Sequence, residues 1–451
     1  MKNSRFKTEL LKESLIETSA LKLKKEILLF QPSKKIKLNY IGFFVVYFTL
    51  SIINTYLVVY IPVYLLNILN VNRSDLAFIQ VFTFSVLLLA PALGFFFDKY
   101  NRQRKKILFL SILVCILSFI CTIFSGVFLY LFGSFLALNL LSSEIIKVCM
   151  SRIILESSLN EVIKDRNLTI INISANFGGF ISSIIFIILV NDIYNLELWI
   201  YFFLFGGIVI LPILTALFCF DFKNTPYKHT HTRKTKDNSN KTHHFQKLLL
   251  TLSYILIWSD RLYQYPLVSW ITSKYGQIGL KIFSFSYVFF LLLNTLGWMI
   301  GQKISNNSKR NIKKKVINLN PDFNKQLDPD FIANKRIYAI IITNCIYILL
   351  TFLMIFSNLI ILLFIYSLIW FVAGIMMLNY ISLSISISKN MKYQTFSFQI
   401  FKLGLAVASV IFIPMGTFLS SFVSTESLIL MVGFLSFFSL IPLFYLKHSY
   451  K

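Results

Sequence analysis

Twelve runs of about 20 mostly apolar residues, separated by polar segments, dominate the sequence. They lie at residues 41–66, 76–97, 107–124, 126–150, 168–190, 198–220, 248–272, 282–301, 337–356, 358–380, 396–420 and 425–446. A helix that crosses a membrane needs about 20 consecutive apolar residues. The chain is also 56% hydrophobic and only 14% charged, whereas soluble domains carry about 25% charged residues. The sequence therefore predicts an all-α integral membrane protein with twelve transmembrane helices.

The basic residues alternate between the two sides of these runs. Of the 44 Lys and Arg residues, 38 lie in the segments on one side, three on the other, and three inside apolar runs. Cytoplasmic loops carry such an excess of Lys and Arg, so we expect both termini to be cytoplasmic, in a multi-pass protein of the plasma membrane. The net charge of +25 is explained by this placement, and we expect no nucleic-acid partner.

The composition of the segments predicts how the chain is divided. We expect a cytoplasmic N-terminal segment, two six-helix bundles joined by a linker, and a short cytoplasmic tail. Within the first segment, residues 6–30 alternate Leu and Lys, which predicts an amphipathic helix on the anionic lipids of the inner leaflet. The predicted boundaries are 1–40, 41–220, 221–247 (linker), 248–446 (with a cytoplasmic loop at 303–336) and 447–451.

One inner loop, GFFFDKYNRQRK, carries an acid among several bases. Its spaced residues are Gly94, Asp98, Lys99, Arg102, Arg104 and Lys105. A glycine at position 94 lets two helices approach closely. Asp98 can accept hydrogen bonds from a helix N-terminus, where the dipole favours an anion. Arg102 can reach a carboxylate on a neighbouring helix, although a loop that only sets the topology would also be basic.

This spacing resembles the signature loop that joins helices 2 and 3 in the major facilitator superfamily, and the resemblance covers residues 40 to 446. It implies two pseudo-symmetric six-helix bundles, alternating access and a latch of the outward-facing state formed by this loop. Glu161 is the expected partner of Arg102, with Glu156 as second choice. Residues 301–310 resemble a second copy in which Ser305 replaces the acid, so we expect a weak second latch.

Two adjacent charges, Asp260 and Arg261, fall near the middle of the seventh apolar run. Adjacent helical residues point about 100° apart, so the two side chains need not pair with each other. Asp260 could carry a coupling proton, because burial disfavours the charged carboxylate. Arg261 could hold an anionic group of a solute. The alternative is a structural ion pair between helices.

Further polar residues inside the runs are candidates for the solute or proton pathway: Asn54, which is pseudo-symmetric to Arg261, Trp258, Gln264, Glu144, Lys147 and Lys402. The last three lie nearer the cytoplasm and could form an inner gate, or they could only pair locally and snorkel. Three cations against two acids within the runs favour an anionic or zwitterionic solute.

The function that best fits these features is a secondary active transporter, with possible proton coupling, that moves a small solute and acts as a monomer. We expect no catalytic residue, no cofactor and no metal site, although His229, His231, His243 and His244 of the linker could bind a metal loosely. Two alternatives stay open. One is a non-transporting scaffold or sensor that keeps the fold. The other is a polytopic membrane transferase, which is disfavoured because no His lies in a span.

Overall fold

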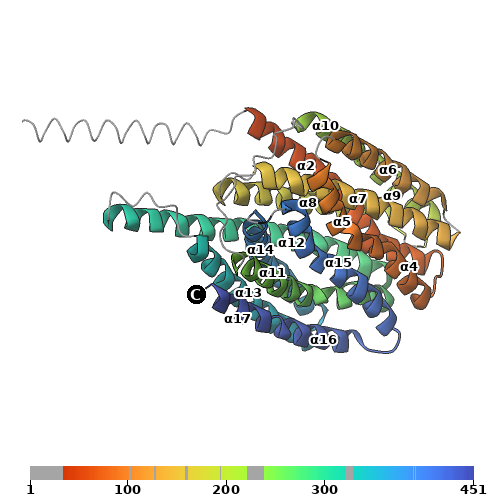
Figure 1. The fold of residues 1–451 in the computed structure, drawn as a ribbon. Helices are drawn as coiled ribbons and strands as arrows, with labels where there is room; N and C mark the ends of the chain where they lie inside the picture. Colours follow the sequence, from red (N-terminus) through yellow and green to blue (C-terminus); the bar gives the residue numbers. More distant parts are fainter. Residues whose placement is uncertain are drawn as a thin grey trace, which may run out of the picture.

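The computed structural model describes residues 34–100, 103–125, 128–157, 161–192, 194–220, 238–319, 329–389, 391 and 393–450, and its regular structure there is helical (Figure 1). The helices of the first half are α2 (Lys34–Thr55), α3 (Ile61–Asn67), α4 (Arg73–Ser85), α5 (Ala90–Lys99), α6 (Arg104–Ser125), α7 (Leu129–Ser157), α8 (Glu161–Leu189), α9 (Leu196–Val209) and α10 (Ala216–Cys219). Those of the second half are α11 (Asn238–Ile257), α12 (Arg261–Leu319), α13 (Pro329–Ile355), α14 (Leu359–Lys389), α15 (Gln394–Leu419), α16 (Thr425–Phe438) and α17 (Leu440–Ser449).

Eleven helical stretches of the described chain are long and apolar enough to cross a membrane. One of them, His243–Ile304, has 62 residues. At 1.5 Å per residue it would be about 90 Å long, roughly three times the thickness of the hydrocarbon core. Its backbone reverses at Gly276, where φ is 58°, a value that glycine adopts readily. This stretch therefore holds two crossings, and the structure confirms the twelve-span, all-α fold.

Several helices extend beyond the predicted spans, because helices do not have to end at the membrane surface. The gap predicted at 273–281 is helical on both sides of Gly276. The fourth span was predicted to end at 150, but α7 continues to Ser157. The cytoplasmic loop predicted at 303–336 contains the end of α12, up to Leu319, and the start of α13 at Pro329. The predicted amphipathic helix at 6–30 and the linker residues 221–237, with His229 and His231, lie outside the described residues.

Irregular turns interrupt the helices beside prolines. A π-helical turn, Tyr56–Tyr60, precedes Pro62, and a 3-10 turn, Val86–Leu89, precedes Pro91. Proline has no backbone N–H to donate, so the regular pattern of helical hydrogen bonds is interrupted and changes its spacing near a proline. Both turns line the central cavity described below, which is where irregular backbone is tolerated inside a membrane.

The two halves lie side by side, with the first half in red to yellow-green and the second in green to blue (Figure 1). Between them, α15 packs along α4 and α5, and α12 packs along α8. Glycines permit the closest of the helix contacts. A side chain at Gly178 of α8 would collide with the carbonyl oxygen of Phe48 on α2, and one at Gly416 of α15 with that of Leu262 on α12. Small residues at such positions let helices pack closely in a membrane.

Candidate functional site

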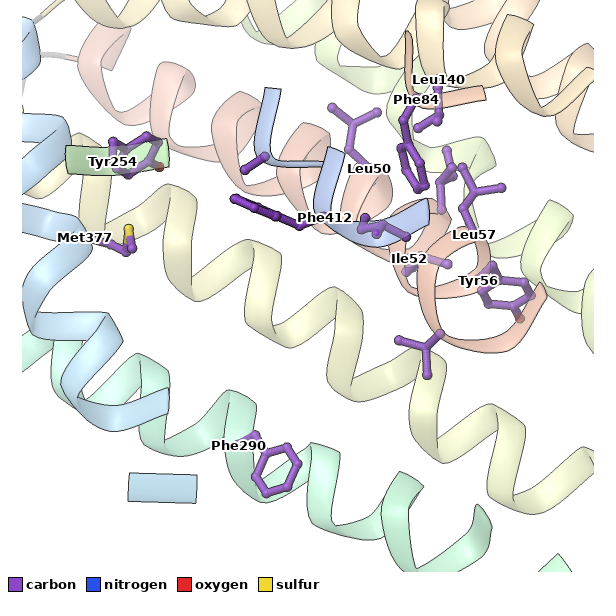
Figure 2. Packing of buried hydrophobic residues seen from close by; sticks show 14 of the residues in the cluster. Leu50, Ile52, Tyr56, Leu57, Phe84, Leu140, Tyr254, Phe290, Met377 and Phe412 are labelled. Atoms are coloured by element: carbon purple, nitrogen blue, oxygen red, sulfur yellow. The ribbon is translucent and has the colours of Figure 1, made fainter. Parts of the chain in front are cut away.

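A cavity of about 410 Å³ lies between the two halves. The first half contributes residues of α2 and α3, α4 and α7, and the second half contributes residues of α11, α12, α14 and α15. Figure 2 shows part of this wall, with Leu57, Phe84 and Leu140 together on one side of the view and Tyr254 on the other. Solute sites of several hundred cubic ångströms between helices are typical of drug-sized ligands.

The cavity brings together seven of the eight predicted pathway residues, which come from α2, α7, the α11–α12 region and α15. They are Asn54, Glu144, Lys147, Trp258, Arg261, Gln264 and Lys402. The eighth, Asp260, is not part of the cavity lining. Sequence position alone placed these residues within apolar runs, and the packing of the two halves makes them neighbours of one space.

The helix that carries Asp260 and Arg261 is interrupted at these residues. α11 ends at Ile257, a 3-10 turn covers Trp258–Asp260, and α12 starts at Arg261. Pro266 lies one turn further on, and its missing N–H leaves the carbonyl of Leu262 without a helical partner. That carbonyl faces Gly416 of α15, so the break also brings α15 close to the cavity.

Arg261 reaches the cavity without a carboxylate partner. Its guanidinium lies over the ring of Trp258, 4.9 Å from the centroid, a favourable cation–π geometry. Its Nε atom is buried and has no hydrogen-bond partner. Among the described residues, no carboxylate oxygen lies within 4.0 Å of this guanidinium. Arg261 is therefore positioned to bind an anionic group in the cavity.

Asp260 is held apart from its neighbour, as the 100° rotation between adjacent residues predicts. Its Oδ2 atom accepts a hydrogen bond from Nε2 of Gln264 at 3.0 Å. Its Oδ1 atom is buried without a hydrogen-bond partner. A buried carboxylate oxygen with no donor is costly in a membrane interior, and binding a proton would lower that cost.

The end of the cavity on the side of Asp98 carries Glu144, Lys147 and Lys402. Lys147 lies 3.8 Å from Glu144 on the same face of α7. Lys402 of α15 donates to Oγ of Ser151 on α7 at 2.9 Å, and its ammonium lies 5.0 Å from the ring centroid of Phe398. A neutral hydroxyl and a ring face are weaker partners than a carboxylate. Lys402 thus links the two halves and leaves its charge uncompensated by any ion pair in the described chain.

The predicted latch residue Asp98 binds the start of α15 across the interface between the halves. Its Oδ2 accepts from the backbone N–H of Phe396 at 2.9 Å, and its Oδ1 accepts from that of Thr395 at 3.3 Å. The dipole of α15 favours an anion at this end. Oδ1 also accepts from Nη1 of Arg152 at 2.6 Å. Gly94 permits α5 to approach α15 this closely, because a side chain at position 94 would press against the backbone of Phe396.

The other residues of this loop are arranged differently from the expectation. Arg104 donates to both carboxylate oxygens of Glu156, at 3.1 and 2.9 Å, and Arg152 donates to Glu156 at 2.8 Å. Lys99 lies over the ring of Tyr100. The expected pair of Arg102 and Glu161 lies outside the described residues and side chains.

A buried ion pair joins the two halves nearby, and sequence reasoning missed it. Nη2 of Arg336 on α13 donates to both carboxylate oxygens of Asp165 on α8, at 3.0 Å each. The hydroxyl of Ser382 on α14 donates to the same carboxylate at 2.9 Å. Lys164, next to Asp165, donates to the carbonyl of Ser382 and to the hydroxyl of Ser386. In the sequence, Asp165, Arg336 and Arg152 stood among the many inner charges that orient the spans, so no local signal separated them.

The opposite end of the cavity is closed by fewer polar contacts. Thr417 of α15 donates to Oε1 of Gln80 on α4 at 2.7 Å, and Arg73 donates to the carbonyl of Ser420 at 2.6 Å. Both links join one half to the other. The described residues hold no group of three or more His, Cys, Asp or Glu side chains arranged to bind a metal ion.

Comparisons with known proteins relate this chain to a known family and to a known fold. Residues 38–318 match the profile of the Major Facilitator Superfamily. The crystal structure of the nucleoside transporter NupG has a similar fold, with a TM-score of 0.57 at 9% sequence identity, and the match covers 93% of this chain and 100% of that chain. At this identity the likeness concerns the fold alone. No curated protein matches the sequence.

Proposed function

The chain belongs to the major facilitator superfamily of membrane transporters, and we propose that it moves a small solute across the membrane by alternating access. In this mechanism the two halves rock about a central site and open it to one side at a time. The observation that carries the proposal is the cavity itself. It lies between the halves and is lined by both.

The polar contacts at the two ends suggest how the site is gated. On the side of Asp98 and Asp165, the buried ion pair of Asp165 with Arg336 and the hydrogen bonds of Asp98 to the start of α15 join the halves. On the side of Arg73 and Gln80, two hydrogen bonds do so. We therefore assign the first set to a cytoplasmic latch that must break before the site opens inward. A contact made in only one state shifts the population toward that state.

The coupling ion is a proton in this proposal, and Asp260 carries it. Its unpartnered Oδ1 and its position beside Arg261 support this role. When Asp260 is protonated, it carries no charge, so the positive potential around Arg261 is at its strongest and favours an anionic solute. When Asp260 is ionised, its negative charge weakens that potential. Binding of the proton and of the solute would then be linked.

Two-sided access to the cavity tests the mechanism without knowledge of the solute. Ser409 lines the cavity, and cysteine is close to serine in size. In a variant whose five native cysteines are replaced, Ser409→Cys should react with a membrane-impermeant maleimide in right-side-out and in inside-out vesicles. Ser420→Cys, beside Arg73, should react only from outside. Reaction of position 409 from one side alone, or from neither, would favour the scaffold or sensor alternative.

The orientation in the membrane is part of the same proposal. Both termini are cytoplasmic, and the protein resides in the plasma membrane. Arg73→Cys and Tyr194→Cys should be labelled from outside intact cells, whereas Tyr100→Cys, Thr235→Cys and Asn320→Cys should not. External labelling at position 235 would exclude this topology.

A further inference from the structure

The lining of the cavity changes in polarity from one end to the other. Leu65, Leu76 and Leu136 line it within about seven residues of the helix ends on the side of Arg73. Glu144 and Lys147 lie about two and three turns beyond Leu136 along α7, and Lys402 lies about two turns from the start of α15. At 1.5 Å per residue, Lys147 is about 16 Å beyond Leu136 along α7. The cavity thus has a charged end at Lys147 and Lys402 and a mostly apolar remainder toward the side of Arg73, in which Arg261 is the charged exception.

The lining as a whole has an excess of positive charge. In the described chain, Lys147, Arg261 and Lys402 line the cavity against one carboxylate, that of Glu144, which already lies 3.8 Å from Lys147. Arg261 and Lys402 have no carboxylate partner among the described residues. An uncompensated cation inside a membrane is expensive, and an anionic group bound at Arg261 would satisfy it. A cationic ligand would meet repulsion in this cavity.

The apolar end requires a ligand with more than a charged group. A free inorganic anion would leave most of the 410 Å³ to water, which takes about 30 Å³ per molecule in the liquid. Water gains little from walls such as Leu65 and Leu136. Rings of Tyr287, Tyr366 and Trp370 also line the space, with Tyr287 and Trp370 in edge-to-face contact at 5.8 Å. Such surfaces favour an apolar or aromatic body.

We infer that the solute is an amphiphilic organic anion, with one carboxylate or phosphate group held by Arg261 and an apolar body lying against the aromatic rings and leucines of the lining. This inference rests on the proposed function for the site itself and adds the substrate class. A zwitterion fits less well, because Glu144, the carboxylate in the lining of the described chain, is already beside Lys147.

Binding to the purified full-length protein in detergent tests the inference with a matched set of probes. These are 4-phenylbutyrate, 4-phenylbutanol, 4-phenylbutylamine, phenylalanine, acetate and inorganic phosphate. Trp258 and Trp370 line the cavity, so tryptophan fluorescence and calorimetry both report binding. We expect 4-phenylbutyrate to bind at least tenfold more tightly than each of the other five. Shortening it by one methylene should weaken binding by about fourfold, the effect of one buried CH₂.

Two variants separate recognition in the cavity from partition into the detergent. Arg261→Gln should weaken 4-phenylbutyrate binding by about ten- to hundredfold, the usual effect of losing a hydrogen bond to a charged group. The matched control is Lys274→Gln. Lys274 is on the same helix and also lies over a tryptophan ring, at 5.1 Å from the centroid of Trp270, but it is exposed and is not part of the cavity lining. It should leave binding unchanged. If Arg261→Gln does not fold, Arg261→Lys takes its place, because the loss of the planar fork weakens bidentate binding.

Three results would overturn the inference. They are equal binding of the alcohol or the amine, tighter binding of phenylalanine, and equal losses in the position 261 and 274 variants. Failure of the proposed function looks different. Anion binding without two-sided labelling of Ser409→Cys would contradict transport and keep the ligand class. Two-sided labelling without anion preference would keep transport and reject the ligand class.

Discussion

The interface around Asp98 and Asp165 and the central cavity both bury charge, but they treat it differently. At the interface, the side chains of Asp98 and Arg152 are each 4% exposed and are paired at 2.6 Å, and the pair of Asp165 and Arg336 is equally buried. In the cavity, Arg261 faces a tryptophan ring and Lys402 a serine hydroxyl. Paired charges are compensated within the protein, whereas unpaired charges are available to a ligand.

The two ion pairs at the interface also differ from each other. Arg152 has a second acid, Glu156, at 2.8 Å, and Glu156 is itself 31% exposed. The carboxylate of Asp165 is 0% exposed and receives Arg336 and Ser382. Removing one partner of a fully buried pair leaves a desolvated charge, whereas a charge that keeps another partner is affected less. The comparison therefore ranks the expected effects of substitutions on stability.

The largest loss is expected for Asp165→Asn. Arg336 would then stay buried without this anion, which typically destabilises a protein by roughly 3–5 kcal/mol. Thermal denaturation in detergent and the amount of folded protein in the membrane measure the effect. Asp165→Asn combined with Arg336→Gln should recover most of the stability. A single substitution as stable as the parent would show that this pair does not hold the halves together.

A smaller loss is expected for Asp98→Asn. Arg152 keeps Glu156, and the amide oxygen of the new side chain can still accept from one backbone N–H, so we expect about 1–3 kcal/mol from the lost charged hydrogen bonds. Because these contacts join the halves on the side that we propose to be cytoplasmic, the labelling of Ser409→Cys should shift toward the inside while expression stays near normal. An unchanged ratio of inner to outer labelling would contradict the role of Asp98 as a latch.

Beside the cavity, Asp260→Asn should change transport much more than stability. Asp260 makes no ion pair within the described chain, so its loss should alter the unfolding free energy by about 1 kcal/mol or less. Uphill transport of 4-phenylbutyrate in proteoliposomes should vanish, while exchange of labelled for unlabelled anion should survive, because exchange needs no net movement of protons. Restored uphill transport in the double variant Asp260→Asn, Arg261→Gln would instead identify the two residues as a structural pair.

The smallest effect on stability is expected for Glu144→Gln. Its contact with Lys147 is long, at 3.8 Å, and both side chains are partly accessible, so the loss should be about 0.2–1 kcal/mol. Removing the one lining carboxylate should also raise the affinity for 4-phenylbutyrate a few-fold. Weaker binding of the anion in this variant would mean that Glu144 itself contacts the solute.

Much of the fold followed from local patterns. The apolar runs gave twelve crossings, and the divergence of Asp260 and Arg261 followed from the geometry of one helix. Boundaries such as the end of α7 at Ser157 could not be predicted, because hydropathy marks the lipid and not the length of the helix. Of the latch, the position of Asp98 at a helix N-terminus was anticipated from its chemistry, but its partners Arg152 and Phe396 were not.

By itself, the sequence determined that each apolar segment forms a helix in lipid and pairs its own backbone N–H and C=O groups. It also determined that most of the basic residues lie on one side of the membrane. These are properties of short stretches and of one solvent boundary, so they can be read locally. Only the tertiary structure decided which charges meet. Asp165 and Arg336 are 171 positions apart, and Lys402 and Ser151 are 251 apart. The identity of a charged residue in the sequence is the same whether packing places it beside an oppositely charged partner or in the wall of a cavity.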